Sequence, residues 1–312
     1  MALLSGLNQL IKKAKTTLTD VDAILHATTI ATNAVLERKG ASTALITTKG
    51  FRDVLIIGRQ KRYETYDLYI NKPKPLVERK SIFEVLERTD YDGSISTPLD
   101  YASLDEAVKK IIELNVNSVA ISLIHSYANP SHENVIRDTI LRRAPQLSVS
   151  VSSEISPKLR EYERTNTAVA NAYVQPILDR YIARLESALA KKGFKNDLFI
   201  MQSNGGLVSP KIARDYPIRV VESGPAAGVL MGGMVGERVG EKHVITFDMG
   251  GTTAKLGAVD NGRPAISPTF EIGHVQFKKG SGLPINVPSV ELIEIGACLL
   301  YTSPSPRDGQ IS

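Results

Sequence analysis

The segment from residue 243 to residue 264 holds the residues whose types and spacing best suit chemistry on a phosphate. An apolar, β-favouring run ends at Asp248 and is followed by the turn Gly250-Gly251-Thr252-Thr253. Glycines let backbone N–H groups approach an anion closely, and threonine hydroxyls add donors. A carboxylate beside such a cradle suits Mg²⁺ with a nucleotide, because this cation takes oxygen ligands and bridges phosphates. Taken alone, the residues fit a tight hairpin with a solvated aspartate equally well.

Strands and helices that would position this segment alternate along the chain. Apolar periodicity and turn residues predict strands over 21–25, 44–47, 82–86, 118–123, 148–151, 198–201, 219–221, 244–247 and 256–259. They predict helices near the N-terminus and over 30–38, 51–57, 104–114, 130–143, 161–192 and 226–240. The alternation favours an α/β layered fold, with strand 244–247 buried.

The longest predicted helix, 161–192, marks the expected boundary between domains. Pro176 should kink or interrupt it, and Gly193 should end it. A new strand begins shortly afterwards, so we expect one region over 1–192 and a second over 193–297. Residues 298–312 form a third, separate stretch.

Composition sets the class of protein. The chain has 312 residues, of which 42% are hydrophobic and 23% charged, as in soluble globular proteins. Its net charge is +5, and basic residues are interleaved with acidic ones, so we expect no nucleic-acid surface. No apolar run is long enough to span a bilayer, and no secretory signal pattern occurs at the N-terminus. Cys298 is the single cysteine, which excludes a disulfide framework and makes a reducing cytoplasm the expected compartment.

Further polar residues lie where predicted strands meet helices. Thr28, Thr29, Thr32 and Asn33 could bind substrate or phosphate, or simply cap the helix that follows. Gly224, at the start of the helix opened by Ser223-Gly224-Pro225, is a second candidate phosphate contact. Helix packing alone explains that glycine equally well.

Arginines and histidines give weaker signals. Arg59, Arg62 and Arg164 suit a substrate carboxylate, which a guanidinium binds by a bidentate fork, although a surface salt bridge is the favoured role for any one of them. His26, His125 and His243 lie at strand ends without metal-ligand spacing, which favours structural roles. Ser203 lacks the setting of a hydrolase nucleophile.

Several short phrases occur in a fixed order along the chain. They are the run 26–34 (HATTIATNA), LERKG at 36–40, TKGFRD at 48–53, GRQ at 58–60, HSY at 125–127, EYERT at 161–165, QSNGG at 202–206, SGPAAG at 223–228 and FDMGGT at 247–252. This ordered set resembles the hydantoinase A/5-oxoprolinase family, from about residue 3 to Ala297. An ordered set is far more specific than any single motif.

The resemblance implies an actin-like ATPase fold, in which two lobes of mixed sheet with flanking helices clamp ATP and Mg²⁺. It implies ATP-dependent opening of a lactam or hydantoin ring, through phosphorylation of the amide oxygen, in concert with a B-type subunit. In this family context Asp248 is the catalytic and metal-binding carboxylate. The phosphate contacts are Gly250, Gly251, Thr252, Thr253 and Gly224, and the substrate contacts are Thr28, Thr29, Thr32, Asn33 and Arg59. A ketone carboxylase subunit and a non-catalytic nucleotide-binding scaffold are the alternatives.

The chain departs from the family pattern in ways that bear on activity. The first phosphate loop, D-x-G-G-T-F-T-D, does not occur, so we expect an incomplete fold and an inactive chain on its own. Lys255 stands where the family commonly has a carboxylate, and solvent is its slightly favoured environment over a phosphate. Residues 298–312 resemble a translated sequencing adapter, so we expect a fragment cut at both ends with a non-native tail.

Overall fold

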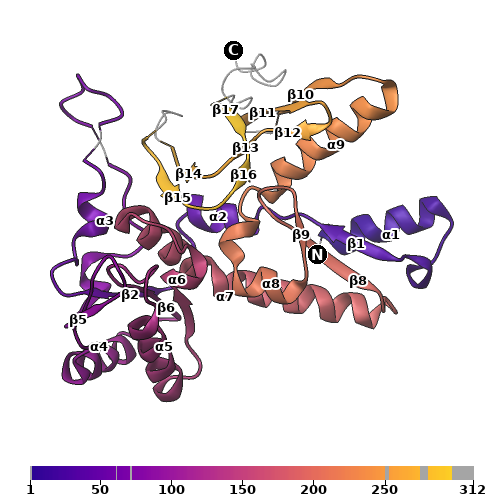
Figure 1. The fold of residues 1–312 in the computed structure, drawn as a ribbon. Coiled ribbons are helices and arrows are strands. Elements are labelled where there is room, and N and C mark those ends of the chain that lie inside the picture. The colour runs from indigo at the N-terminus through magenta and orange to yellow at the C-terminus, as the bar shows by residue number, and fades with distance from the viewer. Residues whose placement is uncertain (1, 61, 71, 250–252, 275–279, 297–312) are drawn as a thin grey trace, which may run out of the picture.

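One long helix, α7 (Glu161–Lys191), runs through the molecule and packs against two of its sheets (Figure 1). The computed structural model describes residues 2–60, 62–70, 72–249, 253–274 and 280–296. Within α7 the stretch from Glu163 to Val174 is buried all round, whereas the later turns bury one side only. The chain stays helical through Pro176, so the predicted interruption does not occur; packing on the flanking turns offsets the lost backbone hydrogen bond.

The first sheet is parallel and lies between helices. Its order is β3-β2-β6-β7, formed by β2 (Thr43–Thr48), β3 (Ile82–Val85), β6 (Ser118–Ser122) and β7 (Ser148–Val151). Helices α4 (Tyr101–Glu113) and α5 (Ser131–Arg143) share one core with it, and α7 contributes to a second core with Leu45 and Ala120. Covered on both faces, β2 and β6 are buried along their whole length, as is usual for parallel sheets.

The second sheet carries the strand-to-helix junction predicted to bind substrate. Strand β1 (Ala23–His26) pairs in parallel with β8 (Asp197–Met201), and β9 (Leu207–Val208) pairs antiparallel with β8. The later turns of α7, the N-terminal helix α1 (Ala2–Ala14) and α8 (Pro210–Asp215) pack on it. Helix α2 (Ile30–Leu36) follows β1 directly.

The third sheet carries Asp248 and is antiparallel. It consists of β10 (His243–Met249), β11 (Thr253–Asp260), β12 (Arg263–Pro264) and β17 (Leu292–Gly296), with β11 between β10 and β17. Helix α9 (Ser223–Val239) covers one face, where glycines let it approach closely. Between β11 and β12 the chain turns at Asn261 and Gly262, whose φ of 49° and 75° are those that a type I′ hairpin requires.

Short elements complete the described part of the chain. They are α3 (Val54–Ile57), α6 (Ser152–Ile155), β4 (Arg88–Thr89), β5 (Ile95–Thr97), β13 (Ile266–Ser267), β14 (Phe270–Ile272), β15 (Leu283–Ile285), β16 (Ser289–Val290) and the 3₁₀ turns Leu18–Asp20, Arg79–Ser81 and Pro217–Val220. No helix within the described ranges is long and apolar enough to cross a membrane.

Two strand predictions are wrong. Residues 217–220 form a 3₁₀ turn in place of the strand predicted at 219–221, because Pro217 starts a helical turn there. Strand β10 is half exposed: Ile245 and Phe247 expose 77% and 61% of their surface, because α9 covers only the opposite face. The cradle residues 250–252 and the predicted tail at 298–312 lie outside the described residues.

Candidate functional site

The start of α9 meets the loop between β1 and α2, and this junction forms the centre of the candidate site. The Ser223 hydroxyl accepts a hydrogen bond from the backbone N–H of Thr28 at 3.2 Å and donates one to the carbonyl of Thr28 at 3.1 Å. One turn along α2, the Thr32 hydroxyl accepts from the backbone N–H of Glu222 at 3.0 Å. These hydroxyl groups are buried. Their hydrogen bonds join the β1–α2 region to the start of α9, which lies nearly 200 positions later in the sequence.

Glu222 and Lys255 form an ion pair beside this junction. Lys255 Nζ lies 2.5 Å from Glu222 Oε2, and the two side chains are only 17% and 16% exposed. Glu222 immediately precedes α9 and has a left-handed backbone with φ of 63°, a conformation that costs free energy for a residue with a side chain. The predicted solvent environment of Lys255 is therefore wrong: its charge is taken up by a carboxylate from another element.

Asp248 lies on the same face of the sheet as Lys255. The two residues pair directly across β10 and β11, and paired residues of an antiparallel ladder point to one face. That face also carries Val244 and Thr246, which contact Gly236 and Gly232 of α9. Because α9 runs opposite to β10, the Asp248 end of the strand lies toward the N-terminal half of α9. Asp248 itself is exposed.

The predicted phosphate contacts are only partly described. Gly250, Gly251 and Thr252 lie outside the described residues, and Thr253 begins β11, with its backbone paired to Gly296. Gly224 lies in the first turn of α9, where an added Cβ would come within 3.4 Å of the Thr29 methyl group, an ordinary contact. Gly232, Gly233 and Gly236 are the glycines of α9 that allow its close approach to the sheet.

The donor set of this junction suits a nucleotide phosphate. An ammonium group at Lys255 and the N-terminus of a 17-residue helix both favour an anion. For Mg²⁺, no group of three or more His, Cys, Asp and Glu side chains gathers anywhere in the described ranges. Asp248 alone would hold this ion together with phosphate oxygens and water, which is a common arrangement for Mg²⁺.

The four polar residues at the β1–α2 junction divide into two buried and two exposed. Thr28 and Thr32 are buried by their contacts with Ser223 and Glu222. The Thr28 hydroxyl also accepts from the backbone N–H of Ile30 at 3.2 Å, a local turn contact. Thr29, which directly precedes α2, makes no side-chain capping bond. Thr29 and Asn33 are exposed and bonded to each other at 3.4 Å.

The arginines differ from one another. Arg59 is half exposed and forms an ion pair with the buried carboxylate of Glu163, which occupies the fork predicted for substrate. Arg62 donates to the backbone carbonyl of Asp67. Arg164 is fully buried and donates to the carbonyls of Leu123 and Lys158, so its expected surface salt bridge is wrong. Burial lowers the pKa of Arg164.

The histidines have the structural contacts that were predicted. His26 Nε2 lies 2.8 Å from the Tyr181 hydroxyl of α7, which fixes the end of β1 to the long helix. Burial lowers the pKa of His26 and raises that of Tyr181. His125 Nδ1 lies 3.1 Å from the carbonyl of Thr89, and His243 forms an exposed pair with Asp260 at 2.7 Å.

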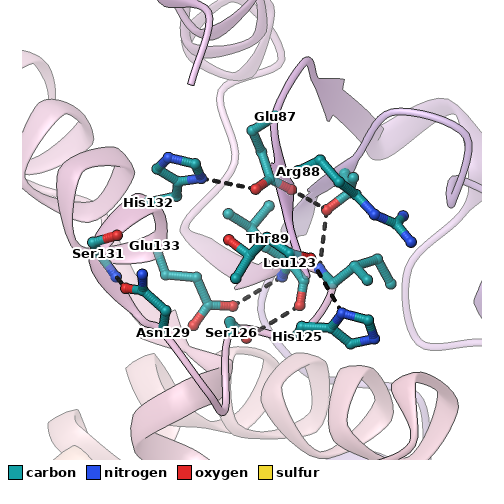
Figure 2. A network of polar contacts seen from close by, with 12 residues as sticks. Glu87, Arg88, Thr89, Leu123, His125, Ser126, Asn129, Ser131, His132 and Glu133 are labelled. Carbon is teal, nitrogen blue, oxygen red and sulfur yellow. Dashed lines mark hydrogen bonds and ion pairs between the residues drawn. The ribbon is translucent and has the colours of Figure 1, made fainter. Parts of the chain in front are cut away.

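A second polar cluster lies at the carboxyl ends of the parallel strands and was not predicted. Figure 2 shows Glu133 of α5 pointing at the chain after β6, where it accepts from the backbone N–H of Leu123 at 2.9 Å. Glu133 also accepts from Ser152 and from the backbone N–H of Ser153, and Glu87 joins His132 to Thr48. The carboxylates are buried and fully bonded, which indicates a structural network rather than a site open to ligands.

Sequence reasoning did not single out Glu222 or the hydroxyl of Ser223 as site residues. Their signal is an acidic residue directly before the Ser-Gly-Pro start of a helix, together with a lysine replacing the acidic residue of a later motif. Neither feature is informative until the fold brings the two segments together.

Two models of hydantoinase/oxoprolinase regions together match most of the chain. The hydantoinase/oxoprolinase N-terminal region matches residues 1–144, and the hydantoinase/oxoprolinase domain matches residues 164–298. An uncharacterized protein of Methanocaldococcus jannaschii is 40% identical over 92% of this chain and 43% of its own length. The caprolactamase subunit alpha of Pseudomonas jessenii is 33% identical over 89% of this chain and 39% of its own length.

Solved structures agree with these matches. The crystal structure of the ATP-dependent caprolactamase from Pseudomonas jessenii superposes with a TM-score of 0.81 at 32% identity, covering 95% of this chain and 42% of that one. A nucleotide-free acetone carboxylase structure superposes with a TM-score of 0.78 at 27% identity, covering 90% and 40%. The mixed α/β architecture is thus consistent with the actin-like ATPase type that was predicted. The chain spans about 40% of the length of the Methanocaldococcus jannaschii protein and of the caprolactamase subunit alpha.

Proposed function

This chain belongs to the hydantoinase/oxoprolinase family, and we propose that it is part of an A-type subunit that opens a lactam or hydantoin ring at the expense of ATP. The observation that carries the proposal is the match to an ATP-dependent caprolactamase over 95% of this chain. The junction of α2, α9 and the β10–β11 hairpin, where Lys255 pairs with Glu222, supports a nucleotide site at this junction.

The proposed roles follow from position and charge. Asp248, exposed at the end of β10, holds Mg²⁺ or orients water. The residues from Gly250 to Thr253, with Gly224 at the start of α9, contact phosphate. Thr28, Thr29, Thr32 and Asn33 line the junction on the side of α2, and Arg59 is the proposed contact for substrate.

The proposed chemistry activates an amide. The carbonyl oxygen of the ring attacks the terminal phosphorus of ATP, so that an O–P bond forms, the bridging P–O bond breaks and ADP leaves. Water then adds to the activated carbon and the C–N bond breaks, with a proton passing to the departing nitrogen. A second water hydrolyses the remaining acyl phosphate to the carboxylate and phosphate. Catalysis rests on positioning and on neutralising phosphate charge, which is the general requirement of phosphoryl transfer.

Partner and compartment belong to the proposal as well. The matched caprolactamase chain is named as a subunit, which supports a requirement for a second, B-type subunit. The proposed compartment is the cytoplasm, where ATP is available.

The experiment uses the full-length protein, with and without a B-type subunit. ADP release is measured with Mg²⁺, ATP and either 5-oxoproline, a hydantoin, caprolactam or a ketone with bicarbonate. ADP release that depends on a cyclic amide, with the ring-opened amino acid as product, is the expected result. If ADP is released only with the ketone and bicarbonate, the protein belongs to the carboxylase branch. The acetone carboxylase match supports this branch as the second candidate. Turnover independent of every substrate contradicts the enzyme proposal.

A further inference from the structure

We propose that Lys255 is an exchangeable phosphate ligand, held by Glu222 in the structure described here and transferred to a phosphate of the nucleotide when it binds. The inference rests on the proposed nucleotide site and adds to it a residue and a mechanism of exchange. The residues that carry it are Glu222, Lys255 and Asp248.

The position of the ion pair is the first argument. Lys255 extends from β11 on the face that also carries Asp248, and its ammonium group reaches the carboxylate that precedes α9. Both partners are mostly shielded from water, so their attraction is stronger than that of a surface pair. An ammonium group in this place is within the candidate phosphate region and not on a remote surface.

The second argument is competition for the same cation. Glu222 places a carboxylate beside the first turn of α9, where the helix favours negative charge. A nucleotide phosphate has the same charge preference and the same type of oxygen acceptor. Glu222 therefore occupies Lys255 with an internal anion, and a phosphate must take the ammonium group from it.

Charge balance gives the direction of the exchange. Glu222 and Asp248 each carry a negative charge and Lys255 a positive one, and Glu294 of β17 pairs with Lys255 across the sheet, so this end of the sheet repels a free triphosphate. If Asp248 binds Mg²⁺ with the phosphates, that repulsion is relieved, and Lys255 gains more from the phosphate than from the Glu222 carboxylate. A lysine suits this exchange because its ammonium group sits on a flexible stem.

Two single variants test the exchange because they act in opposite directions. Affinity of the full-length protein for MgATP is measured by titration calorimetry. Lys255→Met removes the ligand, and we expect affinity to fall by about tenfold or more. Glu222→Gln releases the ammonium group from its competitor, and we expect affinity to rise, by up to about tenfold.

The double variant separates exchange from a general effect of charge. If Glu222 acts by holding Lys255, the gain from Glu222→Gln disappears in the Lys255→Met background. If Glu222 merely repels phosphate through space, the same gain occurs in both backgrounds, and that result overturns the inference. Lys211→Met, which removes a lysine paired with Asp215 on α8, is the matched control and should leave affinity unchanged.

The remaining outcomes also decide. Circular dichroism and the melting temperature show whether each variant folds; if Lys255→Met does not fold, unchanged affinity in Glu222→Gln alone refutes the exchange. A wild-type protein that binds MgATP while both single variants bind equally well contradicts this inference only. A wild-type protein that binds no nucleotide contradicts the proposed function itself, and the inference falls with it.

Discussion

Asp248 has the exposure that a reacting carboxylate needs, and its neighbours set its role. It is exposed near the end of β10, where it pairs with Lys255 across the sheet on the side of α9. The ammonium group of Lys255 is already bound to Glu222, so the charge of Asp248 is available to a cation that comes with the nucleotide. At the scale of residues, the proposed site therefore combines the exposed carboxylate of Asp248 with the Lys255–Glu222 ion pair.

Asp248→Asn tests that role directly. We expect lactam-dependent ADP release to fall by about 10²-fold or more, because the amide cannot replace a carboxylate as a metal ligand or base. The melting temperature should stay the same, since an exposed substitution costs little stability. Asp260→Asn, at the other end of the same hairpin, is the control, and an equal loss of turnover there would contradict the assignment.

His26 gives a stability prediction that depends on pH. Burial lowers the pKa of His26, so the folded protein binds a proton less readily than the unfolded chain, whose value is near 6.5. The stabilising effect of the neutral ring is therefore complete above about pH 6.5 and is lost as the pH falls below it. Between pH 7 and 5, urea unfolding should show a smaller loss of stability in His26→Gln than in wild type. His243→Asn, at an exposed histidine, should follow the wild-type curve.

Helix α5 is tied to the parallel sheet by one buried carboxylate. Glu133 accepts a hydrogen bond from the backbone of Leu123, just after β6 (Figure 2). It also accepts from Ser152 and Ser153, just after β7. At the scale of elements, this network joins the ends of β6 and β7 to α5.

Removing that carboxylate should destabilise the fold strongly. Glu133→Ala leaves buried donors without a partner and removes one of the negative charges near Arg164, and we expect a loss of about 3 kcal/mol or more in urea unfolding. Glu106→Ala removes an exposed carboxylate of α4, paired with Lys110, and should cost less than about 1 kcal/mol. Similar losses in the two variants would refute the structural role.

Helix α9 contains glycines of two kinds, which should respond in opposite ways to alanine. A Cβ at Gly236 would lie 2.4 Å from a methyl group of Val244, so Gly236→Ala must push α9 off the sheet at a cost of about 1–3 kcal/mol. A Cβ at Gly228 meets nothing within 4 Å. Gly228→Ala should therefore stabilise by about 0.5–1 kcal/mol, because alanine favours the helix. Equal effects in thermal unfolding would contradict the packing described here.

The third sheet leaves an apolar face uncovered by any element in the described ranges. Ile245, Phe247 and Met249 of β10 and Ile293 of β17 are exposed, and Phe247 and Ile293 lie on either side of Leu256 across the sheet. Among the described strands, β10 pairs with β11 alone. At the scale of the molecule, exposed apolar side chains and an open strand edge together favour self-association of this chain.

Phe247→Lys should reduce that association. We expect the 312-residue chain to show a weight-average mass that rises with concentration in light scattering, and the variant to shift this rise to higher concentration. Tyr91→Lys, at an exposed aromatic residue elsewhere, is the control for a general effect of charge. A wild-type mass that does not change with concentration would contradict the prediction.

Local sequence determined most of the elements and the family. Apolar periodicity placed the strands of the parallel sheet. Local residue types also account for the Asp100 cap of α4, which accepts from the backbone N–H of Ser103 at 2.8 Å, and for the turn at Asn261-Gly262. These features depend on neighbours a few positions away, so they can be read directly from the chain. The ordered phrases likewise needed no structure, because family identity lies in residue order.

Only the tertiary structure decided which side chains meet. Lys255 lies 33 positions from Glu222, and Arg164 lies 41 from the carbonyl of Leu123, so no local spacing revealed either partner. Burial followed the same rule: β10 has the apolar residues of a core strand, yet α9 covers one of its faces alone. Sequence pattern sets what a segment can bury or bind, and the packing of distant segments decides what it does bury and bind, because burial and charge pairing are properties of surfaces in contact.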